Sequence, residues 1–319
     1  MHGRNGQKKL WEVIGVQQKQ RMSRMRRGEI LAALGFALPS LIGVIVFMII
    51  PAINSLYLSF TQYNVLQPPT FIGVENYRAM ARDPLFWKSL SNTLYMVVVG
   101  VPPQLVTALI IALLLNVDVK GLAFYRAVYF LPSIVPTVAA SVLWMWILNP
   151  RLGILNAALD KIGIVGPGWL TSTTWSKPSI ILMLVWACGQ TMIIYLAGLK
   201  GIPEHLYEAA LIDGANKWAS FRYVTLPMLT PTIFFTMVTA LIGAFQIFTQ
   251  AFITTGGGPV NSTLFYVYYL FNNAFSFFKM GYASALAWVL FGIIFVVTII
   301  QFGLRKRWVY YEYDSEGDA

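Results

Sequence analysis

The sequence predicts an all-α integral membrane protein with six transmembrane helices and both termini in the cytoplasm. Three observations lead to this prediction: a low share of charged residues, six long windows without charge, and an uneven distribution of Lys and Arg between them. Of 319 residues, 57% are hydrophobic and only 11% are charged, whereas a soluble domain carries about a quarter charged residues. This composition excludes a soluble globular, disordered or coiled-coil protein.

The charge-free windows set the positions of the helices. A transmembrane helix needs about 20 apolar residues to cross about 30 Å of hydrocarbon, and a charged residue at its centre costs about 2.5–3.5 kcal/mol. Within the windows we predict spans at 30–58, 91–115, 127–149, 178–200, 224–250 and 281–304. The first span contains Pro39 and Pro51, so we expect it to be kinked.

The window 223–278 is too long for one helix, and residues 254–261, which include three glycines and Pro259, break it. The aromatic segment 262–278 could form a seventh span. With six spans, however, 16 Lys and Arg fall on one side and 7 on the other, and the excess includes eight in residues 1–29. The positive-inside rule then places both termini in the cytoplasm, and we interpret 262–278 as a helix at the outer interface.

This topology divides the chain into three parts. Residues 1–29 form a basic cytoplasmic segment, 30–304 form the transmembrane domain, and 305–319 form a cytoplasmic tail. The basic segment is explained by membrane orientation and by attraction to anionic lipid, so we expect the lipid bilayer and no nucleic acid as its partner.

The sequence lacks the motifs of catalysis and energy coupling. It has no P-loop, no H-E-x-x-H and no G-x-S-x-G motif, and with one Cys and two His we predict neither a metal site nor catalytic residues. No charged residue lies in the middle of a predicted span, where ion-coupled pumps need one. Energy for uphill transport must therefore come from a partner.

The cytoplasmic loop 201–227 predicts a short rigid helix. Pro203 and Glu204 suit its first turn, strong helix formers follow, and Gly214 is placed to end it. Small residues on its surface allow another backbone to approach, and Glu208 offers a charge for pairing. An ordinary connector between helices is the alternative interpretation.

The spacing in this loop resembles a family motif. Glu208-Ala209-Ala210, then Gly214 after three residues, then Val224, Leu226 and Pro227 resemble the EAA loop of permease subunits in bacterial binding-protein-dependent ABC importers; the family favours Ile at position 224. The segments 71–77 (FIGVENY), 202–215, 255–259 (TGGGP) with Ser262 and Thr263, and 281–287 (GYASALA) are similar to the carbohydrate-uptake, maltose-type branch. The resemblance covers the chain from about residue 30 to the last span.

The resemblance implies a type I ABC importer permease fold in the bacterial cytoplasmic (inner) membrane, multi-pass, with N-in/C-in topology. It implies a second permease subunit, as a heterodimer, two P-loop ATPase subunits that bind ATP and Mg, and an extracytoplasmic solute-binding protein. This chain would hold no cofactor. Carried over by position, the residues that contact the ATPase would be Glu208, Ala209, Ala210, Asp213 and Gly214, while Leu226 and Pro227 would fix the angle of the fifth span.

Polar residues on the fifth span are candidates for the substrate path. Thr239, Gly243, Gln246 and Gln250 are spaced to share one face of a helix. Contact between helices is an equally supported role, because small and amide residues are common there. Further candidates elsewhere are Trp186, Gln190, Tyr195, Ser284 and Trp288. The substrate site could also lie mainly in the partner permease.

Two other classes of protein compete with this interpretation. An ion-coupled secondary transporter would need charged groups at the midplane and often an internal repeat. A membrane enzyme acting on a lipid-linked sugar would need a catalytic acid, base or metal cluster. The predicted outer loops hold Glu75, Asp83 and Asp160 without motif spacing.

Overall fold

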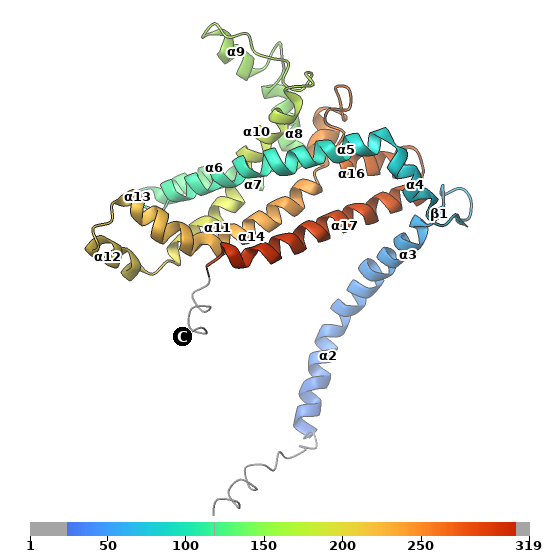
Figure 1. The fold of residues 1–319 in the computed structure, drawn as a ribbon, viewed down its shortest axis with the longest axis horizontal. Helices are drawn as coiled ribbons and strands as arrows, with labels where there is room; N and C mark the ends of the chain where they lie inside the picture. Colours follow the sequence, from blue (N-terminus) through green and yellow to red (C-terminus); the bar gives the residue numbers. More distant parts are fainter. Residues whose placement is uncertain (1–23, 118, 311–319) are drawn as a thin grey trace, which may run out of the picture. The chain divides into compact units, whose positions relative to one another are not determined.

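The structure is a computed structural model that describes residues 24–117 and 119–310 (Figure 1). Most of the predicted basic segment 1–29 and the acidic end of the predicted tail 305–319 lie outside the described residues. The chain divides into two units, residues 1–55 and 56–319. The first unit contains α2 (Arg24–Val44), a π-helical turn η1 (Ile45–Ile49) and the start of α3 (Ile50–Ser59), and residues Ala32–Ser59 form one apolar helix long enough to cross a membrane.

Three prolines in the long helices are preceded by wide turns, whereas Pro39 in α2 and Pro231 in α14 (Leu226–Phe245) are not. The π-helical turns η1, η2 (Met96–Gly100) and η3 (Phe221–Thr225) each end two residues before a proline, namely Pro51, Pro102 and Pro227. Proline has no N–H to donate, and its ring collides with the carbonyl four residues back, so a locally widened turn accommodates it. At Pro51, where the sequence predicts a kink, the structure has the π-helical turn η1, and the helix continues beyond it as α3.

The second unit is built almost entirely of helices. After a two-stranded hairpin, β1 (Thr61–Gln62) antiparallel to β2 (Thr70–Phe71), the helices follow in the order α4 (Glu75–Arg82), α5 (Pro84–Tyr95), α6 (Val101–Leu114), α7 (Leu122–Ile134), α8 (Thr137–Ile147), α9 (Ile154–Asp160), α10 (Ser176–Trp186), α11 (Gly189–Lys200), α12 (Glu204–Ile212), α13 (Lys217–Ser220), α14 (Leu226–Phe245), α15 (Thr249–Thr254), α16 (Tyr266–Phe271) and α17 (Met280–Leu304), with a further π-helical turn η4 (Asn272–Ser276) and a final 3₁₀ turn η5 (Arg305–Arg307).

By length and composition, the described part of the chain has four helices that could cross a membrane, and six if each of two bent helix pairs is one span. The unbroken helices are Ala32–Ser59, Pro84–Leu114, Lys217–Phe245 and Met280–Arg307. The last of these confirms the predicted span 281–304. The second begins earlier than the predicted residue 91, because the Asp83 carboxylate accepts a hydrogen bond from the Leu85 N–H (2.8 Å) and caps a helix that starts at Pro84.

The predicted span over 127–149 is not one continuous helix in the structure. The structure has α7 and α8, bent by 98° at residues 135–136. Pro136 disfavours helical backbone in the residue before it, and Val135 is extended (φ −65°, ψ 127°). The span predicted over 178–200 is likewise bent, by 47° between α10 and α11. There Gly189 begins α11 against α7, and a Cβ at this position would lie 2.6 Å from the Tyr129 carbonyl oxygen.

The fifth predicted span ends earlier than residue 250. Helix α14 stops at Phe245, and α15 begins at Thr249. Beyond α15 the chain reverses through the glycine-rich segment, where Gly256, Gly257, Val260 and Asn261 all have positive φ. The aromatic segment 262–278 forms only the short α16 and the turn η4, which are too short to cross a membrane.

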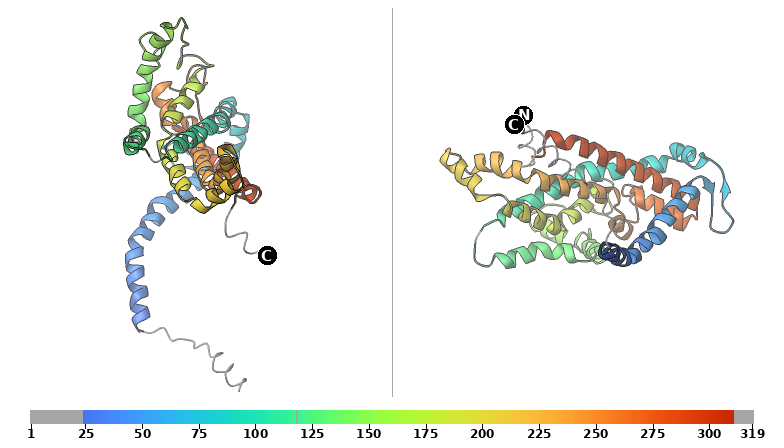
Figure 2. Two further views of the ribbon diagram at one scale, coloured as in Figure 1. Left: turned by 90° about the vertical axis from the view of Figure 1, so that its left-hand side faces the viewer. Right: turned by 90° about the horizontal axis from the view of Figure 1, so that it is seen from below.

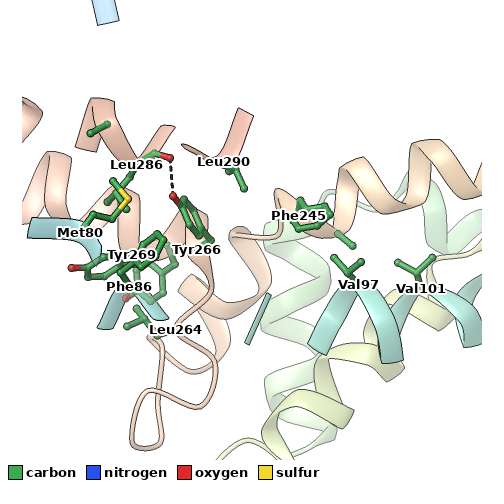
Figure 3. Close-up of a cluster of buried hydrophobic side chains, with 13 residues drawn as sticks. Met80, Phe86, Val97, Val101, Phe245, Leu264, Tyr266, Tyr269, Leu286 and Leu290 are labelled. Carbon is green, nitrogen blue, oxygen red and sulfur yellow. Dashed lines mark hydrogen bonds between the residues drawn. The ribbon is translucent and has the colours of Figure 1, made fainter. Parts of the chain in front are cut away.

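Three clusters of buried side chains hold the second unit together. One joins α4, α5, α14, α16 and α17, and includes the Tyr266 hydroxyl, which donates to the Leu286 carbonyl oxygen (2.9 Å, Figure 3). A second joins α6, α11, α12 and α14, and a third joins η2, α8, α10 and α15. In this unit α12 and α13 lie at one end of the long helices, and α4, β1 and α16 lie at the other (Figures 1 and 2). These ends are called here the α12 end and the α4 end.

The start of α17 fits against the β hairpin only because residue 281 is glycine. A Cβ there would lie 2.0 Å from the Thr61 carbonyl oxygen, while the Gly281 N–H donates to the Tyr63 carbonyl oxygen (3.2 Å). We expect Gly281→Ala to lower the free energy of unfolding by about 1–3 kcal/mol, because backbone must move to relieve the overlap. Thermal unfolding of the purified protein would measure this change. Gly292→Ala, on the same helix with nothing within 4 Å of the added methyl, is the control and should not destabilise. Equal unfolding temperatures for both variants would contradict the prediction.

Candidate functional site

Helix α12 presents an exposed surface at its end of the long helices. Glu208, Ala209, Asp213 and Gly214 are exposed, and Ala210 is half-buried. Beside them lie large apolar side chains that are unusually exposed: Leu211 (74%), Ile212 (86%), Trp218 (70%) and Tyr223 (76%). An apolar surface of this kind next to an acidic side chain is typical of a protein contact. The structure therefore brings the five predicted ATPase-contact residues onto one exposed helix and its C-terminal turn.

The end of α12 has the geometry that the sequence predicts. Gly214 has φ +79°, its N–H donates to the Leu211 carbonyl (3.0 Å), and the Ala215 N–H donates to the Ala210 carbonyl (2.9 Å). This is a Schellman cap, which needs a residue in the left-handed region. Asn216 then caps α13, its side chain accepting from the Ala219 N–H (2.9 Å).

Helix α12 is held firmly by the helices on either side of it. Leu206 and Tyr207 pack into the cluster formed by α6, α11 and α14, and the Tyr207 hydroxyl hydrogen-bonds the Thr225 hydroxyl (3.0 Å). Leu226 and Pro227 begin α14 just beyond. Helices α11 and α14 are themselves closely packed, since a Cβ on Gly198 would lie 2.8 Å from the Leu229 side chain. Helix α12 is thus packed directly against α11 and α14.

A polar cavity of about 510 Å³ lies between the long helices. Its polar lining consists of four glutamines and five threonines from α6, α8, α11, α14, α15 and the segment between the last two: Gln104, Gln190, Gln246, Gln250, Thr137, Thr191, Thr236, Thr239 and Thr249. Apolar side chains such as Ile194, Phe235 and Phe248 complete it. The volume is within the range of small-ligand sites.

The four residues predicted from the fifth span all line this cavity. They do not share one helix, however, because Gln246 follows the last residue of α14 and Gln250 lies on α15. The expectation of a single helical face is wrong in that respect. Gln190, from α11, also lines the cavity, whereas Tyr195, Trp288 and Ser284 do not. Tyr195 is buried and its hydroxyl accepts a hydrogen bond from Thr236 (2.8 Å), and the Trp288 ring packs edge-on against Phe291.

None of the four glutamine side chains makes a hydrogen bond to the described residues. Gln190 and Gln246 are exposed, and Gln104 and Gln250 are partly buried. These amides are therefore accessible to water or to a polar ligand in the cavity. Sequence reasoning missed Gln104, which comes from α6 and carries no local pattern that links it to the others. The same lack of partners disfavours a role for these glutamines in contacts between helices of this chain.

A second polar cluster, at the α4 end, joins distant segments. Asp83 accepts hydrogen bonds from the hydroxyls of Tyr269 and Tyr282, the second at 2.9 Å. Partial burial raises the pKa of Asp83, but these bonds and those from the Leu85 and Phe86 N–H groups outweigh it, so the pKa is lowered overall. Burial and the nearby carboxylate raise the pKa of Tyr269. Tyr269 and Tyr282 lie 186 and 199 residues after Asp83 in the sequence. The sequence therefore did not indicate that this carboxylate would meet them.

The glycine-rich segment 255–263 is fastened at the same end. The Asn92 side-chain amide donates to the carbonyl oxygens of Asn261 (2.7 Å) and Leu264 (3.1 Å), the Ser176 and Ser262 hydroxyls are 2.9 Å apart, and the Thr255 and Thr263 hydroxyls are 2.6 Å apart. Asn76 in turn donates to the carbonyl oxygens of Ser59 and Thr61 (both 2.9 Å). The segments 71–77 and 255–263 therefore have a structural role.

This chain belongs to the family of binding-protein-dependent transport system inner membrane components, whose model matches residues 29–310. It is 44% identical over 299 residues to the probable ABC transporter permease protein YesP of Bacillus subtilis (92% of this chain, 96% of the relative). It is 38% identical over 281 residues to the lactose transport system permease protein LacF of Rhizobium radiobacter (85% and 93%). The expected permease family is confirmed, and with it the expectation that the chain is a transporter subunit and not an enzyme or an ion-coupled carrier.

The fold is shared with solved transporters. A chain in the crystal structure of a bacterial alginate ABC transporter, in complex with an alginate pentasaccharide-bound periplasmic protein, matches with a TM-score of 0.78 over 94% of this chain and 98% of that one, at 22% sequence identity. The all-helical permease fold predicted from the sequence is thereby confirmed.

Asp83 gives the α4 end a testable pH dependence. Because its pKa is lowered in the folded protein, the ionised carboxylate contributes stability that is complete above the unfolded value of about 3.9 and is lost as pH falls through the lower folded value. We expect Asp83→Asn to lower the unfolding temperature at pH 7 and to flatten its fall below about pH 4. Asp160→Asn, at an exposed carboxylate, should keep the wild-type profile. Identical pH profiles for wild type and Asp83→Asn would contradict the prediction.

Proposed function

We propose that this chain is the pore-forming permease subunit of an ATP-driven importer for a sugar or oligosaccharide. Family membership supports import with a binding protein, and the relative named for lactose and the structural neighbour named for alginate support a saccharide. The observation that carries the mechanism is the exposed helix α12, clamped to α11 and α14 by buried side chains and the bond between Tyr207 and Thr225.

Energy coupling runs through α12 in this proposal. Two P-loop ATPase subunits bind ATP and Mg, and each receives one such helix, from this chain or from a second permease subunit. Glu208, Ala209, Ala210, Asp213 and Gly214 contact the ATPase, with the exposed Leu211 and Ile212 beside them. Closure of the ATPase pair moves α12, and Leu226 and Pro227 pass the movement to α14. The pore then alternates between inward-facing and outward-facing states.

The proposed topology has six spans, with each bent helix pair crossing once and both termini in the cytoplasm. Several positively charged residues gather at the α12 end, among them Lys120, Arg126, Lys200, Lys217 and Arg222. The end of α17 lies there too, because the Tyr310 N–H donates to the Thr230 hydroxyl (2.9 Å) and Trp308 packs on Phe234. This arrangement agrees with the positive-inside rule. Residues 1–29 and 305–319 are then cytoplasmic segments flanking the domain 30–304, and the first adjoins the lipid surface.

The polar cavity is the proposed substrate path. Its glutamine amides offer both donors and acceptors, and threonine hydroxyls that donate to helix carbonyls, such as that of Thr239, still offer acceptor oxygens. The hydroxyl groups of a sugar require both kinds of partner. The solute-binding protein delivers substrate at the α4 end, opposite α12. Tyr195 and Trp288 then contribute to helix packing and not to the path.

The coupling role of α12 can be tested by mutation. Gly214→Asp and Glu208→Lys should each abolish ATP-driven uptake while membrane insertion is retained. The first strains the cap at φ +79° and the second reverses an exposed charge. Uptake in vesicles with the intact complex, and the amount of protein in the membrane fraction, are the measurements. Gly163→Asp is a matched control: it also has positive φ (+77°) and open space around it, but lies in the loop after α9 and should transport normally. Full uptake by either α12 variant would refute the coupling role.

The role of the cavity can be tested in the same way. Gln246→Ala and Gln250→Ala should weaken uptake without preventing assembly, and Gly243→Leu should reduce the rate further by filling the cavity, since nothing lies within 4 Å of an added Cβ. Gly292→Leu, at an equally open position on α17, is the control for added bulk. Initial rates and apparent affinities with the complete complex would test this. Unchanged kinetics in all three cavity variants would assign these residues to packing.

A further inference from the structure

The first turns of α14 lack one of the hydrogen bonds that normally hold a helix together. In a regular α-helix the carbonyl oxygen of residue 227 accepts the N–H of residue 231, but Pro231 has no N–H. The Thr230 hydroxyl donates to the Pro227 carbonyl oxygen instead (2.6 Å). One side chain thus supplies a bond in place of the one that Pro231 removes, and α14 continues through this point as a single helix.

The Thr230 hydroxyl also holds the segment that follows the last long helix. Its oxygen accepts the N–H of Tyr310 (2.9 Å), which lies 80 residues further along the sequence. Because a hydroxyl has one hydrogen to donate and two lone pairs to accept, both bonds form at the same time. Residues 305–310, which follow α17 and are called here the C-terminal strap, are therefore bonded to the turn of α14 that lacks a backbone donor.

Aromatic side chains attach the strap to α14 at a second point. The Trp308 ring packs edge-on against Phe234 of α14, with centroids 6.0 Å apart, and Phe234 packs edge-on against Phe302 of α17 at 5.1 Å. Phe234 is buried between them. The N–H groups of Trp308 and Val309 both donate to the Arg305 carbonyl oxygen (3.1 and 2.9 Å), so the chain turns directly after α17. The end of α17 is thus fixed to the start of α14.

Helix α12 is bonded just before the start of α14. The Tyr207 hydroxyl bonds the hydroxyl of Thr225, which is buried and is the last residue of the π-helical turn η3. Thr225 and Thr230 are about 7.5 Å apart along the helix axis, at 1.5 Å per residue. A wide turn and an internal proline are both common sites of helix bending. Any bending between η3 and Pro231 would therefore fall between the contact with α12 and the contact with the strap.

We propose that Thr230 is a positioning residue for energy coupling. Its hydroxyl keeps α14 from bending at Pro231 and ties it to the strap, so that a movement of α12 carries both α14 and α17. Helix α17 runs from the strap to the α4 end, where the binding protein delivers substrate in the proposed function (Figure 1). The inference rests on that function and adds α17 to the helices through which the two ends communicate. Without the hydroxyl, part of the movement is lost as bending within α14.

The test measures ATP hydrolysis by the complete complex in proteoliposomes, with and without its solute-binding protein, which is supplied with a mixture of neutral and acidic oligosaccharides. The ratio of the two rates is the stimulation. Because coupling between two sites is reciprocal, we expect Thr230→Val, which keeps the shape of the side chain but not its hydroxyl, to lower the stimulation by about threefold or more. Thr230→Ser keeps the hydroxyl and should stay within about 1.5-fold of wild type.

Two further variants separate this role from general stability. Pro231→Ala returns an N–H to residue 231, so Thr230→Val combined with Pro231→Ala should recover about half of the lost stimulation. Trp308→Ala, in an exposed strap residue, removes the aromatic contact without altering α14 and should lower the stimulation about twofold. Thr298→Val is the matched control, because the Thr298 hydroxyl donates to the Ile294 carbonyl oxygen (2.8 Å) of a helix without proline and should not affect stimulation.

The outcomes distinguish this inference from the function on which it depends. Wild-type stimulation in Thr230→Val or in Trp308→Ala, an equal loss in Thr298→Val, or no recovery on adding Pro231→Ala would overturn the inference. A wild-type complex whose ATP hydrolysis does not respond to the binding protein would contradict the importer function instead.

Discussion

The bilayer offers no water to unpaired polar groups, and most of this structure is arranged around that constraint. Backbone amides are hydrogen-bonded within helices. A wide π-helical turn precedes each of Pro51, Pro102 and Pro227, which have no N–H to donate. Threonine and serine hydroxyls on the long helices bond carbonyls one turn back, as Thr298 does to Ile294 (2.8 Å). Against this background, four glutamine amides that bond no described residue converge on one cavity, and all four are exposed or only partly buried. Their accessibility is the physical argument for a hydrated path.

The two ends of the second unit contain family-like sequence segments that serve opposite purposes. At the α4 end, Asn76, Asn92 and Gly281 are buried against backbone or in hydrogen bonds that fasten the β hairpin, the glycine-rich segment and α17. At the α12 end, Glu208, Ala209 and Gly214 point to solvent and bond nothing beyond the cap itself. The family-like segments at the α4 end therefore stabilise the fold, whereas the one at the α12 end leaves an exposed surface. The structure is needed to distinguish these two roles.

Rigid attachment and local bending are combined in the same helices. Helix α11 is fixed to α14 by close packing at Gly198 and carries α12, yet it is separated from α10 by a 47° bend, and α7 is separated from α8 by 98°. The polar cavity lies beside these bends. Movement at α12 would thus reach the walls of the cavity along α11 and α14, which gives the coupling proposal a physical route.

The sequence alone determined those features that depend on local chemistry. Lack of charge over 20 or more residues specified the apolar helices, and α17 begins and ends within a residue of the predicted span. The spacing of Pro203, Glu204 and Gly214 specified α12 and its left-handed cap, because caps are set by a few neighbouring residues. The bend at Pro136 also has a local cause, in the effect of proline on Val135. Contacts between distant residues, which a sequence does not show, set the bend at Gly189, the end of α14 at Phe245, and the meeting of Gln104 with Gln190 and Gln250. A helical period shows which residues share a face, but it does not show where the helix will stop or what will pack against it. For that reason the cavity and the bonds from Tyr269 and Tyr282 to Asp83 followed only from the packing of segments 60 to 200 residues apart.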